Sequence, residues 1–210
     1  MMTPPWSPAC ERNREPIAEA LSKRLPPPAD GRLAVLEIGS GTGQHASYFV
    51  HRLPWLAWQS SDRAENLEGL RARFAADGVE CELAEPLALE LGQDAWPSRV
   101  YDGVFTANTL HIMPFRLAPV LFDGAYRVLK PGGCLLIYGP FRAGGKHTAP
   151  SNLAFDCSLR ARDPDMGIRD VEAIEIMAQS AGFKKGQWLA MPANNQLLWF
   201  EKENKVNEFK

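Results

Sequence analysis

The stretch that decides the fold is Leu33-Ala-Val-Leu-Glu-Ile-Gly-Ser-Gly-Thr-Gly-Gln-His45. Its apolar first half, residues 33–38, predicts a central strand of a parallel sheet, buried on both faces. Three glycines, Gly39, Gly41 and Gly43, follow at every second position. Apolar residues at helical spacing then predict a helix over residues 46–53. A strand, a glycine turn and a helix in this order let a backbone approach a nucleotide-like ligand closely.

The spacing of the glycines indicates which ligand. A dinucleotide-binding fingerprint has its third glycine three positions after the second, and Gln44 occupies that position here. This argues against a nicotinamide dehydrogenase. Gly43 comes one step early, and Glu37 lies two residues before the first glycine. The pattern resembles motif I of methyltransferases that depend on S-adenosylmethionine (SAM), whose sulfonium, amino-acid end and ribose suit a site with carboxylates.

Length and composition are those of one ordinary domain, so we expect residues 1–210 to form a single methyltransferase domain. The net charge is −2, and nothing in the composition favours nucleic acid or an anionic membrane. The N-terminus lacks a signal-peptide pattern, and no apolar run reaches the ~20 residues that span a bilayer. The four cysteines have no metal-ligand spacing. We therefore expect a cytoplasmic protein without a metal ion.

The rest of the chain predicts alternating strands and helices. Residues 1–30 are expected to form an N-terminal cap segment and helix, irregular up to residue 15 with the helix opening at Pro16. The predicted strands cover residues 55–60, 79–84, 101–107, 134–138, 187–191 and 196–201. The predicted helices cover residues 66–76, 117–129 and 170–181. Residues 139–169 read as a long polar loop, which we expect to hold the substrate, and residues 203–210 as a loose tail.

This pattern predicts an α/β protein with a mostly parallel sheet and a C-terminal antiparallel hairpin. The combination resembles the Rossmann-like, seven-stranded fold of SAM-dependent methyltransferases.

Ligands of such sheets bind beyond the carboxyl ends of the strands, which selects the candidate donor-site residues. The first strand supplies Glu37, Gly39, Ser40, Gly41 and Gly43. An idle carboxylate in a buried run is costly, so we expect Glu37 to serve the ligand. Asp62 follows the glycines by about twenty residues, the distance at which an acid meets ribose hydroxyls. The alternative for Asp62 is a helix cap, because Arg63-Ala-Glu-Asn66 follows.

Two further residues come from the likeness to SAM-dependent enzymes. In those enzymes the end of the fourth strand passes beneath the methionine part, where Asn108 lies. The segment after the third strand, residues 85–90, meets adenine. Leu87 is the candidate to stack on the ring, and an acid of the segment is the candidate to accept from its amino group.

Four other motifs carry a closer resemblance. They are Ser7-Pro-Ala-Cys-Glu-Arg-Asn-Arg-Glu-Pro-Ile17, Ser151-Asn-Leu-Ala-Phe-Asp-Cys-Ser-Leu-Arg160, Gly167-Ile-Arg-Asp170 and Met191-Pro-Ala-Asn-Asn195. Together they are similar to the family of methyltransferase-like protein 26 and its bacterial relatives, over roughly residues 4–202. The resemblance implies a SAM-dependent methyltransferase fold and brings no established substrate with it.

Given this resemblance, Arg12 is expected to pair with the carboxylate of SAM, the alternative being a solvated charge cluster. An acceptor pocket is expected between residues 1–15, residues 139–169 and His111. Its candidate residues are Asn13, Tyr138, Asn152, Phe155 and Asp156. Asp156 is also four residues before Arg160, so the two could form only a helical salt bridge.

His111 is the candidate base, because imidazole titrates near neutral pH; a histidine merely hydrogen-bonded at a strand end is equally compatible. The functional prediction is a SAM-dependent methyltransferase that acts on a small molecule and releases S-adenosylhomocysteine (SAH). A base-methylating enzyme is disfavoured because Asn108-Thr-Leu-His111 lacks the Pro-Pro of that signature. The main alternative is a scaffold or regulatory protein that binds SAM or SAH without turnover. The sequence leaves the oligomeric state open.

Overall fold

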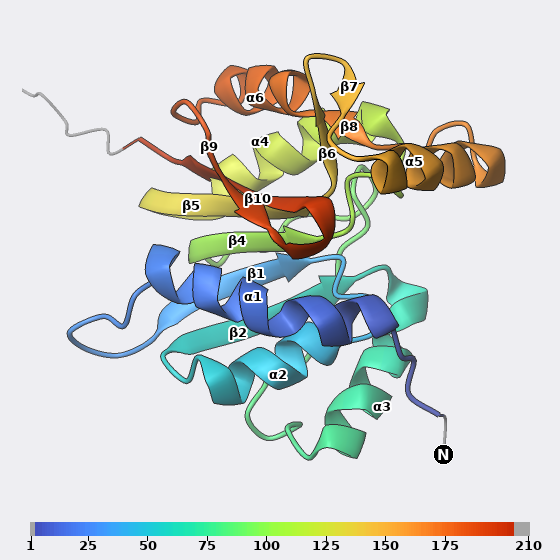
Figure 1. Cartoon of the computed structure of the whole chain (residues 1–210). Coiled ribbons are helices and arrows are strands. Elements are labelled where there is room, and N and C mark those ends of the chain that lie inside the picture. The colour runs from blue at the N-terminus through green and yellow to red at the C-terminus, as the bar shows by residue number, and fades with distance from the viewer. Residues whose placement is uncertain (1–2, 204–210) are drawn as a thin grey trace, which may run out of the picture.

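The computed structural model describes residues 3–203 and contains a central seven-stranded sheet (Figure 1). The strand order is β3-β2-β1-β4-β5-β10-β9. The first five strands in this order are parallel, whereas β10 is antiparallel to both β5 and β9. The strands are β1 (Leu33–Ile38), β2 (Leu56–Asp62), β3 (Leu87–Ala88), β4 (Tyr101–Ala107), β5 (Leu129–Gly139), β9 (Gln187–Met191) and β10 (Asn195–Glu201). This confirms the predicted mostly parallel sheet with a C-terminal antiparallel hairpin.

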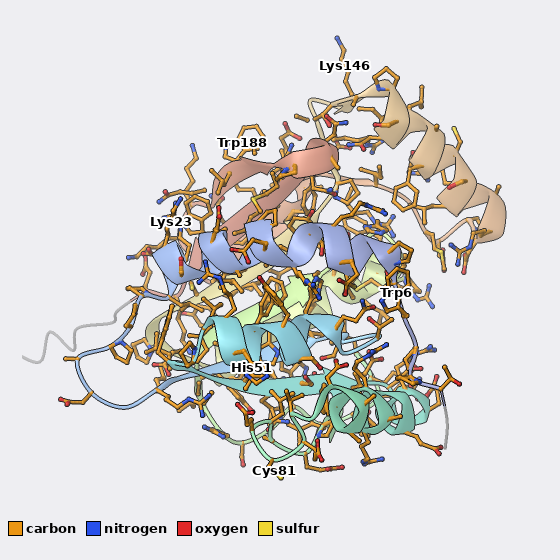
Figure 2. All side chains as sticks on the ribbon, turned by 60° about the horizontal axis from the view of Figure 1, so that its bottom comes forward. Trp6, Lys23, His51, Cys81, Lys146 and Trp188 are labelled. Carbon is orange, nitrogen blue, oxygen red and sulfur yellow. The ribbon has the colours of Figure 1, made fainter. Side chains whose placement is uncertain are left out.

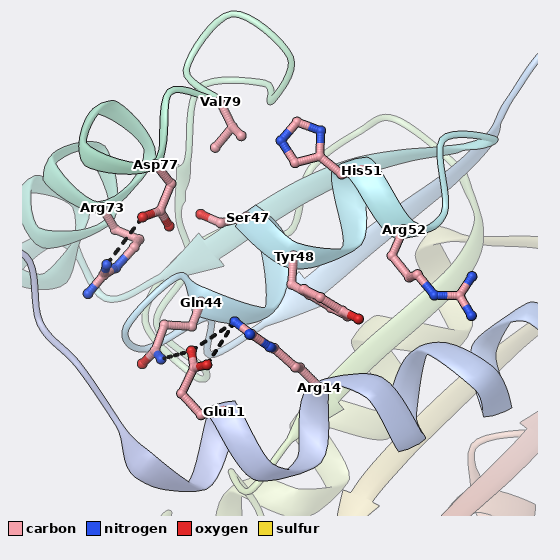
Figure 3. A pocket seen from close by; sticks show the side chains of 10 residues that line it. All are labelled: Glu11, Arg14, Gln44, Ser47, Tyr48, His51, Arg52, Arg73, Asp77 and Val79. Carbon is pink, nitrogen blue, oxygen red and sulfur yellow. Dashed lines mark hydrogen bonds and ion pairs between the residues drawn. The ribbon is translucent and has the colours of Figure 1, made fainter.

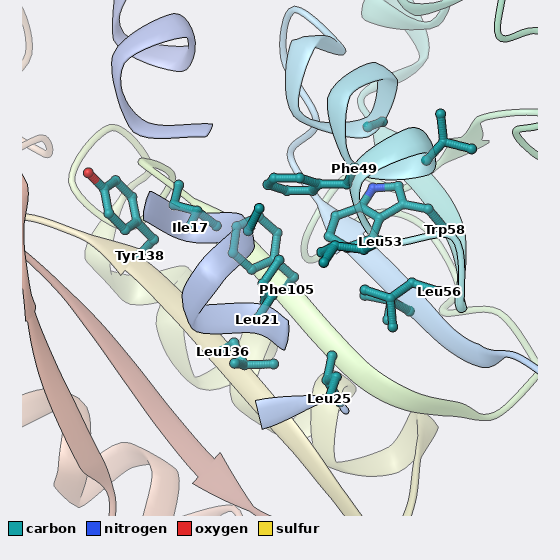
Figure 4. Close-up of a cluster of buried hydrophobic side chains, with 14 of the residues drawn as sticks. Ile17, Leu21, Leu25, Phe49, Leu53, Leu56, Trp58, Phe105, Leu136 and Tyr138 are labelled. Atoms are coloured by element: carbon teal, nitrogen blue, oxygen red, sulfur yellow. The ribbon is translucent and has the colours of Figure 1, made fainter. Parts of the chain in front are cut away.

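Helices cover both faces of the sheet (Figure 1). One face carries α1 (Pro8–Arg24), α2 (Gln44–Arg52) and α3 (Leu67–Asp77), and the other carries α4 (Ala118–Val128) and α6 (Val171–Ser180). The side chains of β1, β5 and β10 alternate between the two resulting cores. On the α1 side, the ring of Phe49 packs against that of Trp58, and Trp58 packs against Phe105, with centroids 5.0 and 5.6 Å apart (Figure 4). Burial of these apolar faces fixes the strand ends that form the site.

The N-terminal prediction was wrong in its boundary. The helix α1 begins at Pro8, and Pro16 lies inside it. A proline at the first position costs nothing, because that N–H has no intrahelical partner. The interior proline is tolerated because Ile17, Ala18 and Leu21 are buried against the sheet, and tertiary packing outweighs local propensity.

Residues 139–169 are not a structureless loop. They contain β6 (Phe141–Ala143), β7 (Lys146–His147) and α5 (Pro150–Arg162), and a small second sheet has the order β7-β6-β8, with β8 at Arg169–Asp170. The inward face of α5 buries Asn152 and Asp156 beside Leu159. Because two of these three residues are polar, a search for apolar periodicity misses the helix.

The predicted third strand was also misplaced. Residues 79–84 form turns, in which the amides of Glu82 and Leu83 donate to the carbonyl of Val79. The edge strand β3 comes later and consists of two residues, both paired with β2. The predicted tail falls largely outside the described residues, and within residues 3–203 no helix is both long and apolar enough to cross a membrane.

Candidate functional site

The carboxyl ends of β1, β2, β4 and β5 meet at one edge of the sheet, where the glycine turn lies. Gly39, Gly41 and Gly43 have φ values of +70°, +56° and +75°, which favour glycine. A Cβ on Gly39 would lie 2.9 Å from Thr109 Oγ1, and one on Gly43 would lie 3.1 Å from side chains of α3. A Cβ on Gly41 would meet nothing within 4 Å. Two glycines therefore serve packing, and Gly41 borders open space where a ligand could approach.

Glu37 is buried beneath this turn, with 1% of its surface exposed. Its Oε2 accepts hydrogen bonds from Ser40 Oγ (2.8 Å), Trp58 Nε1 (3.0 Å) and Ser60 Oγ (3.5 Å). Burial raises the pKa of Glu37 to about 7, against the opposing effect of the Trp58 and Ser40 hydrogen bonds. The carboxylate thus joins the glycine turn to β2. That Glu37 also serves a bound ligand stays a prediction.

Asp62 ends β2 directly beside the turn. Its Oδ2 accepts from the amide of Gly41 (2.6 Å), and its Oδ1 accepts from the amide of Arg63 (2.8 Å) and from Asn66 Nδ2 (2.7 Å). The short 3-10 helix that follows, Ala64–Asn66, has Arg63 as its N-cap and no side-chain cap bond, so Asp62 does not serve as the helix cap of the alternative. The bond to Gly41 places the carboxylate at the mouth of the predicted donor site.

The first turn of α1 covers the glycine turn. Gln44 Oε1 accepts from the amide of Ser7 (2.6 Å) and from Thr42 Oγ1 (3.0 Å), and Gln44 Nε2 donates to Glu11 Oε1 (2.7 Å). Arg12 lies on the same helix, exposed, and makes no hydrogen bond or ion pair within the described residues. These bonds hold the start of α1 beside the glycine turn. Its predicted role as a cap over the donor, and the pairing of Arg12 with SAM, stay predictions.

Asn13 and Tyr138 lie in the interior between α1 and the sheet. Asn13 Oδ1 is 2.8 Å from His45 Nε2, and burial raises the pKa of Tyr138 while the side chain of Asn13 lowers it. Both residues are buried and hold α1 to the carboxyl edge. Their predicted place in an acceptor pocket stays untested.

Asn108 follows β4 in the left-handed conformation, with φ of +59°, and its amide donates to the carbonyl of Tyr138 (2.8 Å). Such a conformation is uncommon for a residue with a side chain and marks functional positions more often than others. Asn108 Oδ1 lies 3.9 Å, and His111 Nδ1 3.7 Å, from the position that a Cβ on Gly139 would take. The ends of β4 and β5 therefore bring Asn108 and His111 together.

His111 is 6% exposed, and its ring contacts that of Phe155 edge-on, with centroids 5.3 Å apart. Burial, and to a lesser extent the charge of Arg169, lowers the pKa of His111 to about 4. The ring is therefore neutral at neutral pH and can accept a hydrogen bond. Its predicted role as a base stays a prediction.

The other candidates on α5 anchor the helix. Asn152 Nδ2 donates to Thr148 Oγ1 (3.0 Å) and to the carbonyl of Asn194 (3.0 Å). Asp156 Oδ1 accepts from the amide of Ile168 (2.7 Å), and Asp156 Oδ2 from Arg160 Nε (3.1 Å), so the salt bridge that the spacing allows does form. Phe155 is the α5 candidate that lies beside His111.

Leu87 lies in β3 itself, opposite Ser61, rather than after a third strand. It is half-buried and packs against the core on the α4 side. This corrects the strand assignment on which the adenine prediction for Leu87 rested.

A groove of about 430 Å³ lies between α1, α2 and α3 (Figure 3). One face of α2 lines it with Gln44, Ser47, Tyr48, His51 and Arg52. The lining arginines are already paired with carboxylates, Arg14 with Glu11, Arg52 with Glu15 and Arg73 with Asp77. None of the predicted site residues lines the groove.

Figure 2 shows Trp6, just before α1, toward the same end of the molecule as α5. This large apolar side chain is exposed, as is Phe155. Within the described residues, His, Cys, Asp and Glu side chains do not gather in groups of three that could hold a metal ion.

Sequence reasoning missed Gln196. This residue is 7% exposed, lies opposite Gly139 in the β5–β10 ladder, and its Oε1 has no hydrogen-bond partner in the described part of the chain. The sequence offered one signal for this residue: Gln196 is an uncharged polar residue directly before the apolar run 197–200.

Residues 4–202 match the model of a family described as "Protein of unknown function (DUF938)". The chain belongs to this family. Its description assigns no function, so the match places the chain among relatives without naming a reaction.

The solved structures similar to the chain include a protein of the O-methyltransferase family from Burkholderia thailandensis and human N-acetylserotonin methyltransferase in complex with SAM. The TM-score is 0.78 for both, with identities of 21% and 17%. The alignments cover 94% and 93% of this chain but only 58% and 53% of those chains. Identities this low establish the fold alone, which is the Rossmann-like methyltransferase fold.

Proposed function

We propose that the protein is a SAM-dependent methyltransferase that modifies a small-molecule acceptor and leaves SAH as product. The observation that carries the proposal is the meeting of an open glycine, Gly41, with the carboxylate of Asp62 and the left-handed Asn108 at one sheet edge. The structural likeness to methyltransferases supports the same class of reaction. Within the DUF938 family, we place the chain with the relatives of methyltransferase-like protein 26, on the four motifs that it shares with them.

The residues present fit SAM. Gly41 leaves space beside the turn, and Asp62 lies at its mouth, where Oδ2 accepts a single protein hydrogen bond and can accept one more from a ribose hydroxyl. The backbone amide of Asn108 is bonded to Tyr138, but its side-chain amide makes no hydrogen bond within residues 3–203. Arg12, exposed on the covering helix, is the candidate partner for a carboxylate. We retain Glu37, Gly39, Ser40 and Gly43 as the frame of this site, and Leu87 as the candidate for adenine.

When bound, SAM supplies an electrophilic methyl group. The chain's own contribution is to hold the two reactants in line and to exclude water, which can supply most of the acceleration of such a transfer. Asp62 and the glycine turn fix the donor end. Asn108 and His111 border the position from which an acceptor approaches, and neutral His111 can accept a hydrogen bond from it. We expect the acceptor to be small, because the net charge of −2 does not favour nucleic acid.

Isothermal calorimetry with SAM and SAH tests the proposal on the wild-type chain. We expect saturable binding of both, and absence of heat with either would refute it. Incubation with methyl-labelled SAM and a small-molecule extract tests turnover. Label in a small molecule supports the enzyme, whereas binding without transfer supports the scaffold that acts through partners.

A further inference from the structure

Gly139, the last residue of β5, lies among polar side chains that lack partners. On the side where its Cβ would point, His111 Nδ1 and Asn108 Oδ1 lie 3.7 and 3.9 Å from the Cβ position. Neither side chain makes a hydrogen bond within residues 3–203. Because Gly139 carries no side chain, nothing of its own fills the space between them.

Gln196 completes this cluster from the neighbouring strand. It pairs with Gly139 in the antiparallel ladder, and directly opposite residues point to the same face with Cβ positions about 5 Å apart. Leu198 and Phe200 follow Gln196 at every second position of β10 and therefore point to the same face of the sheet. Both pack in the core on the α4 and α6 side, so Gln196 also faces that side. Gln196 therefore projects to the side of Gly139 on which His111 and Asn108 lie.

The amide of Gln196 is a costly feature for folding alone. Its Oε1 is fully buried without a donor, although most buried polar groups in proteins have one. Leaving such a group unpaired costs free energy, and an apolar residue of the same shape would avoid the cost. Asn108 adds a strained backbone conformation at the same place. An unpaired buried amide and a strained backbone both lower stability, and packing requires neither. Features that lower stability in this way are typical of binding sites.

We propose that Gln196, together with His111 and Asn108, recognises the methyl acceptor through a hydroxyl or N–H group on a small apolar molecule. The inference rests on the proposed function and adds its substrate class. Gln196 Oε1 is the acceptor atom for that hydrogen, and the edge-on ring of Phe155 beside His111 is the apolar wall. Gln196 is a specificity-determining residue in this arrangement, and an ether, which has no hydrogen to donate, binds more weakly.

Thermal unfolding of the full chain tests the unpaired amide without any ligand. Gln196→Leu is expected to raise Tm by a few degrees, because it removes an unsatisfied buried amide. The matched control is Asn152→Leu, an equally buried amide whose Nδ2 has two partners, and it is expected to lower Tm. A fall in Tm for Gln196→Leu as large as that for Asn152→Leu would overturn the proposal, because the amide would then have a partner, such as a bound water.

A second measurement tests the ligand, using phenol and its methyl ether anisole as probes in ligand-observed NMR titrations of the SAH-saturated chain. We expect phenol to bind the wild type about fivefold more tightly than anisole, the effect of one hydrogen bond. Gln196→Leu is expected to bind both equally while it keeps wild-type affinity for SAH. Equal binding of the two probes to the wild type, or no binding of phenol, would overturn the proposal. A wild type that fails to bind SAH would refute the proposed function, and the Tm comparison would still report on Gln196.

Discussion

The polar side chains at the carboxyl ends of the strands fall into two groups, one bonded within the protein and one without partners among the described residues. In the half formed by β1 and β2, the carboxylates of Glu37 and Asp62 each accept three hydrogen bonds from the protein. In the half formed by β4, β5 and β10, the side chains of Asn108, His111 and Gln196 accept none within residues 3–203. The first half is held in one shape before any ligand binds, whereas the second keeps its hydrogen-bonding capacity free.

This difference agrees with the two roles that we propose. A donor is the same molecule in every turnover, so a rigid and internally bonded frame reduces the ordering cost of binding it. An acceptor is selected by the hydrogen bonds that it makes with polar side chains that otherwise have no partner. A buried polar site of this kind discriminates strongly against molecules that cannot make those bonds.

The largest expected effect comes from breaking the rigid half. Asp62→Ala removes the acceptor of three protein donors, and we expect SAH to bind roughly 10- to 100-fold more weakly in calorimetry, about 1–3 kcal/mol. Asn66→Ala is the control, because it removes one of those donors without altering the carboxylate. Wild-type affinity in Asp62→Ala would place the ribose elsewhere.

A smaller effect is expected from pH. The pKa of Glu37 is raised to about 7 in the free protein, so the carboxyl is partly protonated at neutral pH. A cationic ligand nearby favours the ionised form, so binding releases a proton and affinity for SAM rises with pH through 7. We expect about a fivefold gain from pH 6 to pH 8, measured by calorimetry, for a pKa shift of somewhat under one unit.

The matched variant is Glu37→Gln, which keeps the size of the side chain but cannot titrate. Its affinity for SAM should be flat over the same range. A pH dependence that survives in this variant would show that another group is responsible.

His111 should affect stability rather than donor binding. Its pKa is lowered to about 4 by burial, while the unfolded chain takes up the proton near 6.5. As pH falls from 6.5 toward 4, the unfolded state binds more protons than the native state, so stability is lost in that window. We expect His111→Phe to lose less Tm than the wild type between pH 7 and pH 5, in thermal unfolding followed by circular dichroism. Parallel losses in the two proteins would mean that the buried ring does not resist protonation.

Much of the fold and of the donor half could be predicted from the sequence, because both rest on local patterns. The apolar run before Gly39, the early Gly43 and the position of Asp62 follow from strand burial and turn geometry. The helix α5 could not be predicted, because it buries Asn152 and Asp156 where a helix usually buries apolar residues.

Gln196 could not be predicted for a different reason. Its significance comes from the ladder that sets it opposite Gly139 and from the absence of a donor near Oε1 within residues 3–203. Both facts depend on strands that are far apart in the chain. Asp62 shows the same limit in milder form. Spacing left ribose binding and capping as alternatives, and only the structure shows that its carboxylate makes no cap bond and instead accepts from the open glycine Gly41.

The central claim is that the donor binds over Gly41 and the acceptor beside Gly139. Calorimetric titration of SAH into Gly41→Ala and Gly139→Ala tests it most directly, because the added methyl group meets nothing within 4 Å at Gly41 and only ordinary contacts of 3.7 Å or more at Gly139. We predict that Gly41→Ala, which also carries a positive φ, loses at least about fivefold in SAH affinity, while Gly139→Ala keeps the wild-type value. Equal losses in the two variants, or a loss confined to Gly139→Ala, would contradict the account.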